Sequence, residues 1–161
     1  INGGGQDIYS DRDEFRFVWK QAEGNPVFSA KISSLANTHQ YAKAGLMWRT
    51  KLAPNSPLVL LHVFPNGNVV LRHRASEGSE LQENIIPNNQ WPIYLKLEKS
   101  GDHFQAAYSL DGNNWTGVGD VKVASLTDEG MAGLAVLSHD RDMLVSAEFQ
   151  EVKLGEKEEK P

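Results

Sequence analysis

Leu58–Arg74 reads LVLLHVFPNGNVVLRHR, and this stretch decides the fold class. Leu58–Phe64 is a nearly continuous apolar run of branched and aromatic residues, which is typical of a buried strand. Pro65–Asn68 then supplies an Asn-Gly pair, which suits the positive backbone φ of a hairpin turn. Asn68–Arg74 alternates between apolar and polar residues, as a half-buried strand does. The stretch therefore predicts two antiparallel strands joined by a tight turn.

Similar patterns recur on both sides of this hairpin. The further candidate strands are Glu14–Lys20, Pro26–Ser33, Ala42–Thr50, Ile93–Lys99, His103–Ser109, Val118–Val123, Met131–Ser138 and Leu144–Leu154. With no long helical period, this series predicts an all-β fold, a two-sheet antiparallel β-sandwich. A mixed α+β protein stays open as the weaker alternative, because Ser33–Lys43 and Glu77–Asn84 have room for a helical turn each.

The size of the chain suits one domain. It has 161 residues, and we expect a single sandwich over residues 1–154. Residues 155–161 read GEKEEKP, which is too polar to order itself and indicates a solvated tail or a linker stub. Because the chain begins with Ile1, we expect a processed product or an excised domain that is secreted, periplasmic or at the cell surface.

The composition argues against several classes of function. A formal net charge of −5 disfavours a nucleic-acid partner, which calls for a basic surface. The absence of cysteine excludes disulfides, thiolate metal sites and a cysteine nucleophile. The apolar runs are only a few residues long, so we expect no membrane span.

Four segments carry a resemblance to a known family. They are KAGLMWR at 43–49, YSLDGNNW at 108–115, GLAVLSH at 133–139 and AEFQEV at 147–152, preceded by GGGQDIYSDRDEFRFVW at 3–19. In this order they resemble a bacterial family of concanavalin A-like jelly-roll domains of unknown function. The resemblance covers nearly the whole chain, up to Leu154, and implies a jelly roll of the lectin and glucanase type. It also implies a secreted context, since members of this wider group often sit beside glycosidase or sugar-recognition domains.

The sequence offers little support for an enzyme. Laminarinase-type enzymes of the same fold carry Glu-x-Asp-x-Glu on one strand, a pattern that is absent here. Glu77, Glu80 and Glu83 occur in a polar stretch typical of a solvated loop. Ser138, His139 and Asp140 are adjacent, so their side chains point apart and cannot form a triad by themselves. We therefore favour a non-catalytic protein.

Calcium is the metal that the sequence suggests. Asp7, Asp11 and Asp13 follow a glycine-rich start, and calcium prefers carboxylate and carbonyl oxygens in loops. An acidic turn without an ion is the competing interpretation, because this spacing matches no established motif. The histidines, at 39, 62, 73, 103 and 139, show no metal-ligand spacing.

A basic and aromatic set predicts the ligand face. Arg72 and Arg74 share one face of a strand, and Arg49 and Tyr94 lie in other strands. Rings stack on sugars, and arginine offers a rigid fork of donors to hydroxyls or uronate carboxylates. Trp48 and Arg49 point oppositely, so we expect Arg49 to be solvent-reachable and Trp48 to lie in the core or at the edge of the face. Ion pairing of these arginines within the sheet is the alternative.

Two glycines and one tryptophan are interpreted structurally. Gly45 and Gly133 lie within predicted strands, where a missing side chain lets another backbone or ring approach closely. Trp115 follows the turn at Asp111–Asn114, and we expect it to cap the core.

Taken together, the sequence predicts a non-catalytic, secreted or cell-surface module that binds carbohydrate. The alternatives are a structural domain that packs against a neighbouring domain without a glycan ligand, and a glycosidase with scattered carboxylates.

Overall fold

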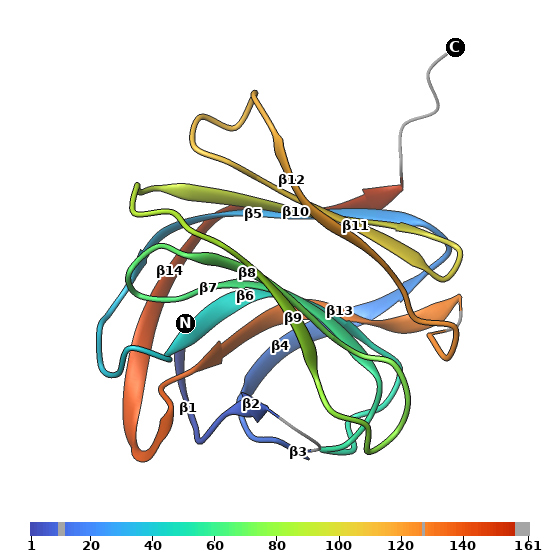
Figure 1. Ribbon diagram of the computed structural model, residues 1–161, viewed down its shortest axis with the longest axis horizontal. Helices are drawn as coiled ribbons and strands as arrows, with labels where there is room; N and C mark the ends of the chain where they lie inside the picture. Colours follow the sequence, from blue (N-terminus) through green and yellow to red (C-terminus); the bar gives the residue numbers. More distant parts are fainter. Residues whose placement is uncertain (10–11, 127, 157–161) are drawn as a thin grey trace.

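The computed structural model describes residues 1–9, 12–126 and 128–156, and these form two antiparallel sheets stacked face to face (Figure 1). The first sheet has the order β1-β14-β5-β10-β11-β12, and the second has the order β4-β13-β6-β7-β8-β9. The prediction of an all-β sandwich is confirmed. The described residues contain no helix, so both segments proposed for helical turns lack them. They likewise contain no helix of the length and apolarity that crossing a bilayer requires.

The strands have the following bounds. The first sheet comprises β1 (Asn2–Gly5), β5 (Pro26–Leu35), β10 (Ile93–Ser100), β11 (His103–Ser109), β12 (Thr116–Lys122) and β14 (Asp140–Glu156). The second comprises β4 (Arg16–Glu23), β6 (Lys43–Arg49), β7 (Leu58–Val63), β8 (Val69–Arg74), β9 (Gln82–Ile86) and β13 (Glu129–Leu137). A short ribbon joins β2 (Ile8–Tyr9) to β3 (Arg12–Asp13).

Each candidate strand from the sequence corresponds to a strand in the structure, with ends shifted by a few residues. The hairpin at the centre of the prediction is β7–β8, and Gly67 in its turn has a φ of 96°. β14 starts at Asp140 and continues to Glu156, which pairs with Pro26. The predicted polar tail therefore overlaps the end of β14 by two residues, and residues 157–161 lie outside the described part.

The main core lies between the two sheets. Leu46, Trp48 and Leu61 from the second sheet pack with Leu95 and Phe104 from the first, and all five are buried. The rings of Trp48 and Phe104 meet across the sandwich with centroids 6.3 Å apart. The expected burial of Trp48 is confirmed, and it follows from the large apolar area of the indole.

A smaller apolar cluster covers the outer face of the second sheet. Met47, Leu60 and Leu137 point away from the main core and pack with Ile8 and Phe15 from the amino-terminal segment. Figure 1 shows β2 and β3 lying against this side of the sheet. As a result β6 is buried on both faces, which is why every residue of KAGLMWR is buried.

The close packing expected at the two glycines is confirmed, whereas the expectation for Trp115 is wrong. A Cβ at Gly45 would clash with the backbone of Leu61 and His62, and one at Gly133 would clash with the backbone of Val18. Trp115 lies outside the core clusters, because its ring packs 4.2 Å from the Lys96 ammonium on the outer face of the first sheet.

Candidate functional site

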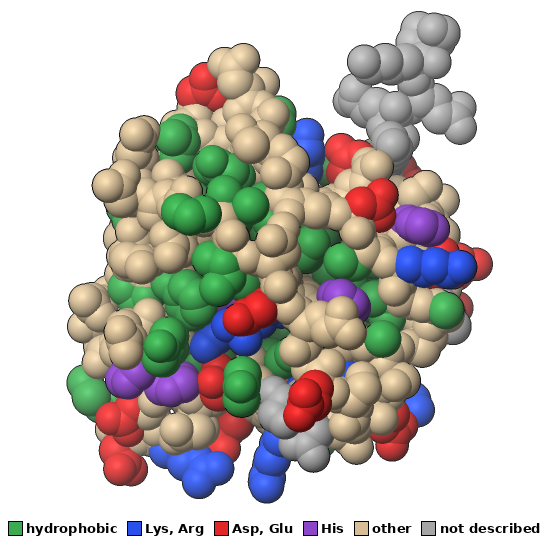
Figure 2. Space-filling model, viewed as in Figure 1, with side chains coloured by type: hydrophobic (Ala, Val, Ile, Leu, Met, Phe, Trp, Pro, Cys, Tyr) green, Lys and Arg blue, Asp and Glu red, His purple; other side chains and the backbone are tan. Residues whose placement is uncertain are grey.

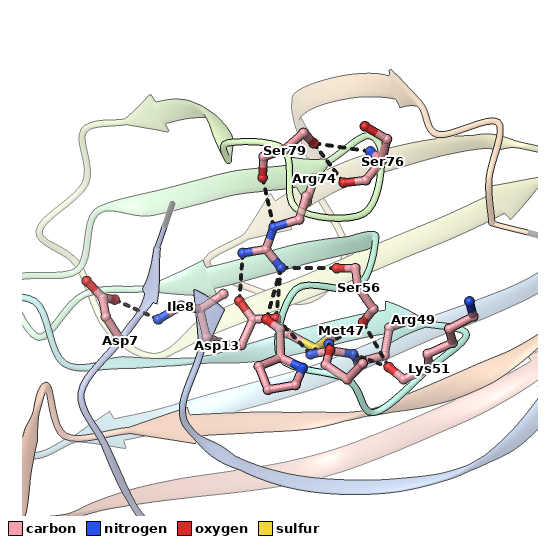
Figure 3. A network of polar contacts seen from close by, with 12 residues as sticks. Asp7, Ile8, Asp13, Met47, Arg49, Lys51, Ser56, Arg74, Ser76 and Ser79 are labelled. Atoms are coloured by element: carbon pink, nitrogen blue, oxygen red, sulfur yellow. Dashed lines mark hydrogen bonds and ion pairs between the residues drawn. The ribbon is translucent and has the colours of Figure 1, made fainter. Parts of the chain in front are cut away.

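Two of the three predicted ligand arginines are interior residues. The side chains of Arg49 and Arg74 are 1% and 0% exposed, and both bind Asp13, which is 1% exposed (Figure 3). Arg74 grips the carboxylate with two nitrogens, at 2.8 and 2.9 Å, and Arg49 reaches it at 3.1 Å. The prediction that Arg49 and Arg74 lie on a solvent-reachable face is therefore wrong, and the alternative of ion pairing is correct for both.

The remaining donors of these arginines hold loops in place. Arg49 donates to the carbonyl oxygens of Lys51 and Ala53, at 2.7 and 2.6 Å, and also to Ser56 Oγ. Arg74 Nε donates to the carbonyl oxygen of Ser79 at 3.0 Å. Burial lowers the pKa of Arg49, and the neighbouring Asp13 opposes that shift. This network fixes the amino-terminal segment and two loops over the second sheet.

The proposed calcium ligands are only partly described. Asp13 accepts from two arginines, Asp7 accepts from Lys43, and Asp11 lies outside the described residues. Within the part of the chain that the structure covers, no group of three or more His, Asp or Glu is placed to hold a metal ion. Calcium binding stays a prediction, and it requires Asp13 to exchange its arginine partners for the ion.

Arg72 lines an open pocket of about 460 Å³ on the outer face of the second sheet, which we call the Arg72 pocket. It is built from β2, the segment before β6, β6 itself, β8, β9 and the junction between β13 and β14. Its lining residues are Asp7, Tyr9, Tyr41, Lys43, Arg72, Glu83 and His139. Figure 2 shows histidine, acidic, basic and hydrophobic side chains gathered on this side of the molecule, at the lower left of the view.

Two ion pairs of Lys43 and Arg72 lie in this pocket, and His139 Nδ1 lies 3.4 Å from Asp7 Oδ2. Lys43 Nζ lies 2.6 Å from Asp7 Oδ1, and it also donates to the carbonyl oxygen of Tyr41. Arg72 Nη2 lies 2.8 Å from Glu83 Oε2. The side chains of Lys43 and Arg72 are only 3% and 7% exposed, whereas that of Glu83 is 43% exposed. Burial lowers the pKa of Lys43, and Asp7 opposes that shift.

The buried His62 accepts a hydrogen bond from Arg72. Arg72 Nε donates to His62 Nε2 at 3.0 Å, so His62 must be neutral with its proton on Nδ1. That Nδ1 lies 3.3 Å from the carbonyl oxygen of Val63. Burial and the Arg72 charge hold the pKa of His62 well below its usual value. His62 therefore orients the guanidinium without competing for Glu83.

Aromatic rings form another part of the pocket lining. Tyr9 and Tyr41 are 63% and 47% exposed, which is unusual for large rings unless they have a use at the surface. The imidazoles of His39 and His139 stack with centroids 4.4 Å apart, and Tyr41 packs edge-on against His139. His139 has a φ of 64°, a strained conformation for a non-glycine residue that tends to occur at functional sites.

This arrangement is suited to holding a polyhydroxylated ligand. Exposed rings offer faces for stacking, while Arg72, Asp7 and Glu83 offer fixed donors and acceptors. Each carboxylate is already held by a cation, Asp7 by Lys43 and Glu83 by Arg72. The pocket therefore presents fixed charges beside exposed rings.

Among the ligand residues predicted from the sequence, only Arg72 reaches this pocket. Trp48 is in the core, and Tyr94 faces outward from the first sheet, on the opposite side of the sandwich. Sequence reasoning missed the roles of Tyr9, Tyr41 and Lys43. These residues come from the two-residue strand β2, the segment before β6 and the fully buried strand β6, respectively. The available signal was that Tyr9 and Tyr41 are aromatic residues outside any alternating run, where no core position calls for a ring.

No protein-family model and no curated protein sequence matches this chain. The family resemblance therefore stays a prediction, whereas solved structures with a similar fold are numerous. A functionally unknown protein from Saccharomyces cerevisiae aligns with a TM-score of 0.80 and 12% identity over 97% of this chain and 86% of that one. The carbohydrate-binding module CBM66 from Bacillus subtilis aligns with a TM-score of 0.62 and 20% identity over 91% and 84%.

Enzymes and a lectin share the same sandwich. A xylan β-1,4-xylosidase from Bacillus halodurans aligns with a TM-score of 0.66 and 16% identity, over 87% of this chain but only 29% of the enzyme. Two alginate lyases and a sheep galectin also align. At these identities the likeness shows a jelly-roll β-sandwich fold and leaves the function to be argued from the site.

Proposed function

We propose that this protein is a non-catalytic carbohydrate-binding β-sandwich, and that the Arg72 pocket is its ligand site. The observation that carries the proposal is the pairing of two exposed tyrosine rings with buried, fixed charges in one pocket. Its volume of about 460 Å³ falls in the range of small-molecule sites. The carbohydrate-related neighbours support the same class of ligand, since they include a carbohydrate-binding module, glycosidases and a galectin.

Binding follows from the division of roles among the lining residues. A sugar ring would stack its C–H face on Tyr9 or Tyr41, which lose little conformational entropy because each ring has few torsions. Its hydroxyls would donate to Asp7 and Glu83 and accept from Arg72, which is already oriented by His62. Such a module would act outside the cytoplasm, beside another domain or at the cell surface.

Affinity electrophoresis and calorimetry with xylan, xyloglucan and alginate test the proposal. We expect Tyr9→Ala and Tyr41→Ala each to weaken binding, with about 1 kcal/mol lost per stacking ring. Leu52→Ala is the matched control, because Leu52 is 60% exposed and lies outside the Arg72 pocket. Full affinity in the Tyr9/Tyr41 double variant would remove this pocket as the site.

The same preparations decide whether the protein is an enzyme. We expect no release of reducing sugar from these polymers and no cleavage of chromogenic glycosides. Turnover that disappears in Glu83→Gln would overturn the non-catalytic assignment, since Asp7 and Glu83 are the two carboxylates of the pocket. A protein that binds none of the polymers would favour the alternative of a structural domain that packs on a neighbour.

A further inference from the structure

The outer face of the first sheet holds another pocket, of about 360 Å³, which we call the Tyr94 pocket. Tyr94 and Trp115 line it together with Glu151, Lys153 and the turn at Asp111–Asn113. Figure 1 shows the connection between β11 and β12 rising from this sheet on the side away from the second sheet. The pocket is therefore on the opposite side of the sandwich from the Arg72 pocket.

A lysine ammonium group lies over each of the two rings of this pocket. Lys31 Nζ lies 5.6 Å from the Tyr94 ring centroid, and Lys96 Nζ lies 4.2 Å from that of Trp115. Tyr94 and Lys96 alternate with buried Leu95, so both point outward from β10. A second hollow of about 490 Å³ continues past Lys96 along the same sheet. The face therefore offers two rings with lysine donors, beside a further hollow lined by polar and small residues.

The wall of the Tyr94 pocket is rigid. Asp111 Oδ1 accepts from the backbone N–H groups of Asn113 and Asn114, both at 2.8 Å, and from Ser109 Oγ at 2.9 Å. These hydrogen bonds hold the pKa of Asp111 well below its usual value. The turn thus places Trp115 in a defined position before any ligand arrives.

Glu151 lines this pocket from a backbone conformation that is strained for a non-glycine residue. The pairing of β14 with β5 shifts between Gln150 and Lys153, and Glu151 in this bulge has a φ of 51°. Bulges of this kind re-aim a side chain, often next to a site. Within the described residues, neither Glu151 nor Lys153 takes part in an ion pair, so both are available to a ligand.

We propose that the Tyr94 pocket is a second carbohydrate site, which makes the chain divalent. The proposal rests on the proposed function in one respect only, the class of ligand. A sugar ring would stack on Tyr94 or Trp115 while Glu151 accepts a hydrogen bond from one hydroxyl and Lys153 donates to a neighbouring one. Because the two pockets lie on opposite faces, one molecule would join two glycan chains.

Calorimetry and tryptophan fluorescence with hexasaccharides from xylan and from alginate test this proposal. We expect two ligands per chain, a change in tryptophan emission, and turbidity on mixing with the parent polymer. Glu151→Gln combined with Lys153→Met should leave one ligand per chain, at least tenfold weaker binding at the lost site, and no turbidity. Trp115→Phe should abolish the fluorescence change, and Glu148→Gln on the same strand should change nothing.

The outcomes separate the two sites. If Tyr41→Ala leaves one ligand that still changes tryptophan emission, the Tyr94 pocket stands independently. One ligand per chain that Tyr41→Ala abolishes and Trp115→Phe leaves intact would overturn the second site while the proposed function survives. One ligand that is insensitive to Tyr41→Ala and lost with Glu151→Gln would do the reverse. No binding of either probe would overturn both.

Discussion

Asp13 shows what one buried residue contributes to this molecule. A single carboxylate faces two guanidiniums, and backbone carbonyl oxygens satisfy the surplus donors. Removing one partner of such a cluster leaves an uncompensated buried charge, which costs more than the cluster gains by forming. Arg49 and Arg74 are therefore structural residues, held by a segment that is close to neither of them in sequence.

Replacing this carboxylate should destabilise the fold strongly. We expect Asp13→Ala to lower the free energy of unfolding by about 3–5 kcal/mol, measured by urea denaturation. The matched control is Glu14→Gln, which breaks the exposed pair between Glu14 and Arg141 and should change stability little. Comparable losses in the two variants would contradict the assignment of Asp13 as the centre of the network.

Glu151 should show a trade of stability against binding. A glycine adopts a φ of 51° without strain, so we expect Glu151→Gly to leave the melting temperature unchanged or higher while it weakens glycan binding. Glu148→Gly in the same strand is the control, because its φ is not in the positive region and the change should cost about 0.5–1 kcal/mol. A large loss of stability in Glu151→Gly alone would show that the side chain is structural.

At the scale of single residues, the sequence predicted which side of a strand a residue lies on, but not which distant segment packs over that side. Two-residue spacing correctly placed Arg72 and Arg74 on one side of β8. It carried no information about Asp13, which comes from a distant segment and folds over that side. The segment that carries Asp13 covers Arg74 but not Arg72, so Arg72 lines the pocket. Burial of a charged residue by a remote partner cannot be read from local periodicity.

Among the elements, β6 is the most constrained strand. It is flanked by β13 and β7, and it is covered on both faces by apolar clusters. Gly45 lets β7 approach, since a Cβ there would lie only 2.5 Å from His62 Cα. This glycine is needed for space rather than for an unusual φ, which explains its position in the middle of a strand.

Gly45→Ala should therefore disrupt the pairing of β6 with β7. We expect a loss of at least about 1–3 kcal/mol, the usual cost of overpacking, because the obstructing atoms belong to the backbone. Gly117→Ala on β12 is the control, since a Cβ there meets nothing within 4 Å and the change should be neutral or mildly stabilising. Equal thermal stabilities of the two variants would mean that β7 can move away freely.

The strands that sequence reasoning found and missed differ in their sequence pattern. The predicted ones alternate or run apolar, and most of them have a buried face. β9 is mostly exposed and lies at the edge of the second sheet, so its residues needed no apolar pattern and the segment resembled a loop. β2 and β3 have two residues each, too few to show a period. Pairing of such strands depends on the sheet that they join.

On the scale of the whole molecule, the sandwich separates a buried charge network and two open pockets. Both non-glycine residues with positive φ in the described chain, His139 and Glu151, lie on β14 or at its start, and each lines one pocket. The connection between β13 and β14 places His139 on the outer face of the second sheet, whereas β14 itself places Glu151 on the outer face of the first. Two neighbouring parts of the chain thus contribute to the two pockets.

The stability of the whole fold should depend on pH through its histidines. Burial lowers the pKa of His62, His73 and His139 below the ordinary value of 6.5. Between their folded pKa values and 6.5, the unfolded chain binds more protons than the folded one, so stability rises with pH in that window. The histidine contribution to stability is fully present above pH 6.5 and falls as the solution is acidified, by up to about 1.4 kcal/mol per pH unit for the fully buried His62. The contributions of His73 and His139 are smaller, because solvent screens these more exposed groups.

His62 should account for the largest part of that slope. It is fully buried, and its unprotonated Nε2 accepts the hydrogen bond that Arg72 Nε donates. Protonation would place a cation against the Arg72 guanidinium and remove the acceptor of its Nε–H. We expect the melting temperature to fall between pH 6.5 and 5, and to fall less steeply in His62→Gln, whose amide oxygen can accept from Arg72 but does not titrate. Identical slopes in the two proteins would mean that His62 is protonated without cost, and the hydrogen bond that orients Arg72 toward Glu83 would then have to be abandoned.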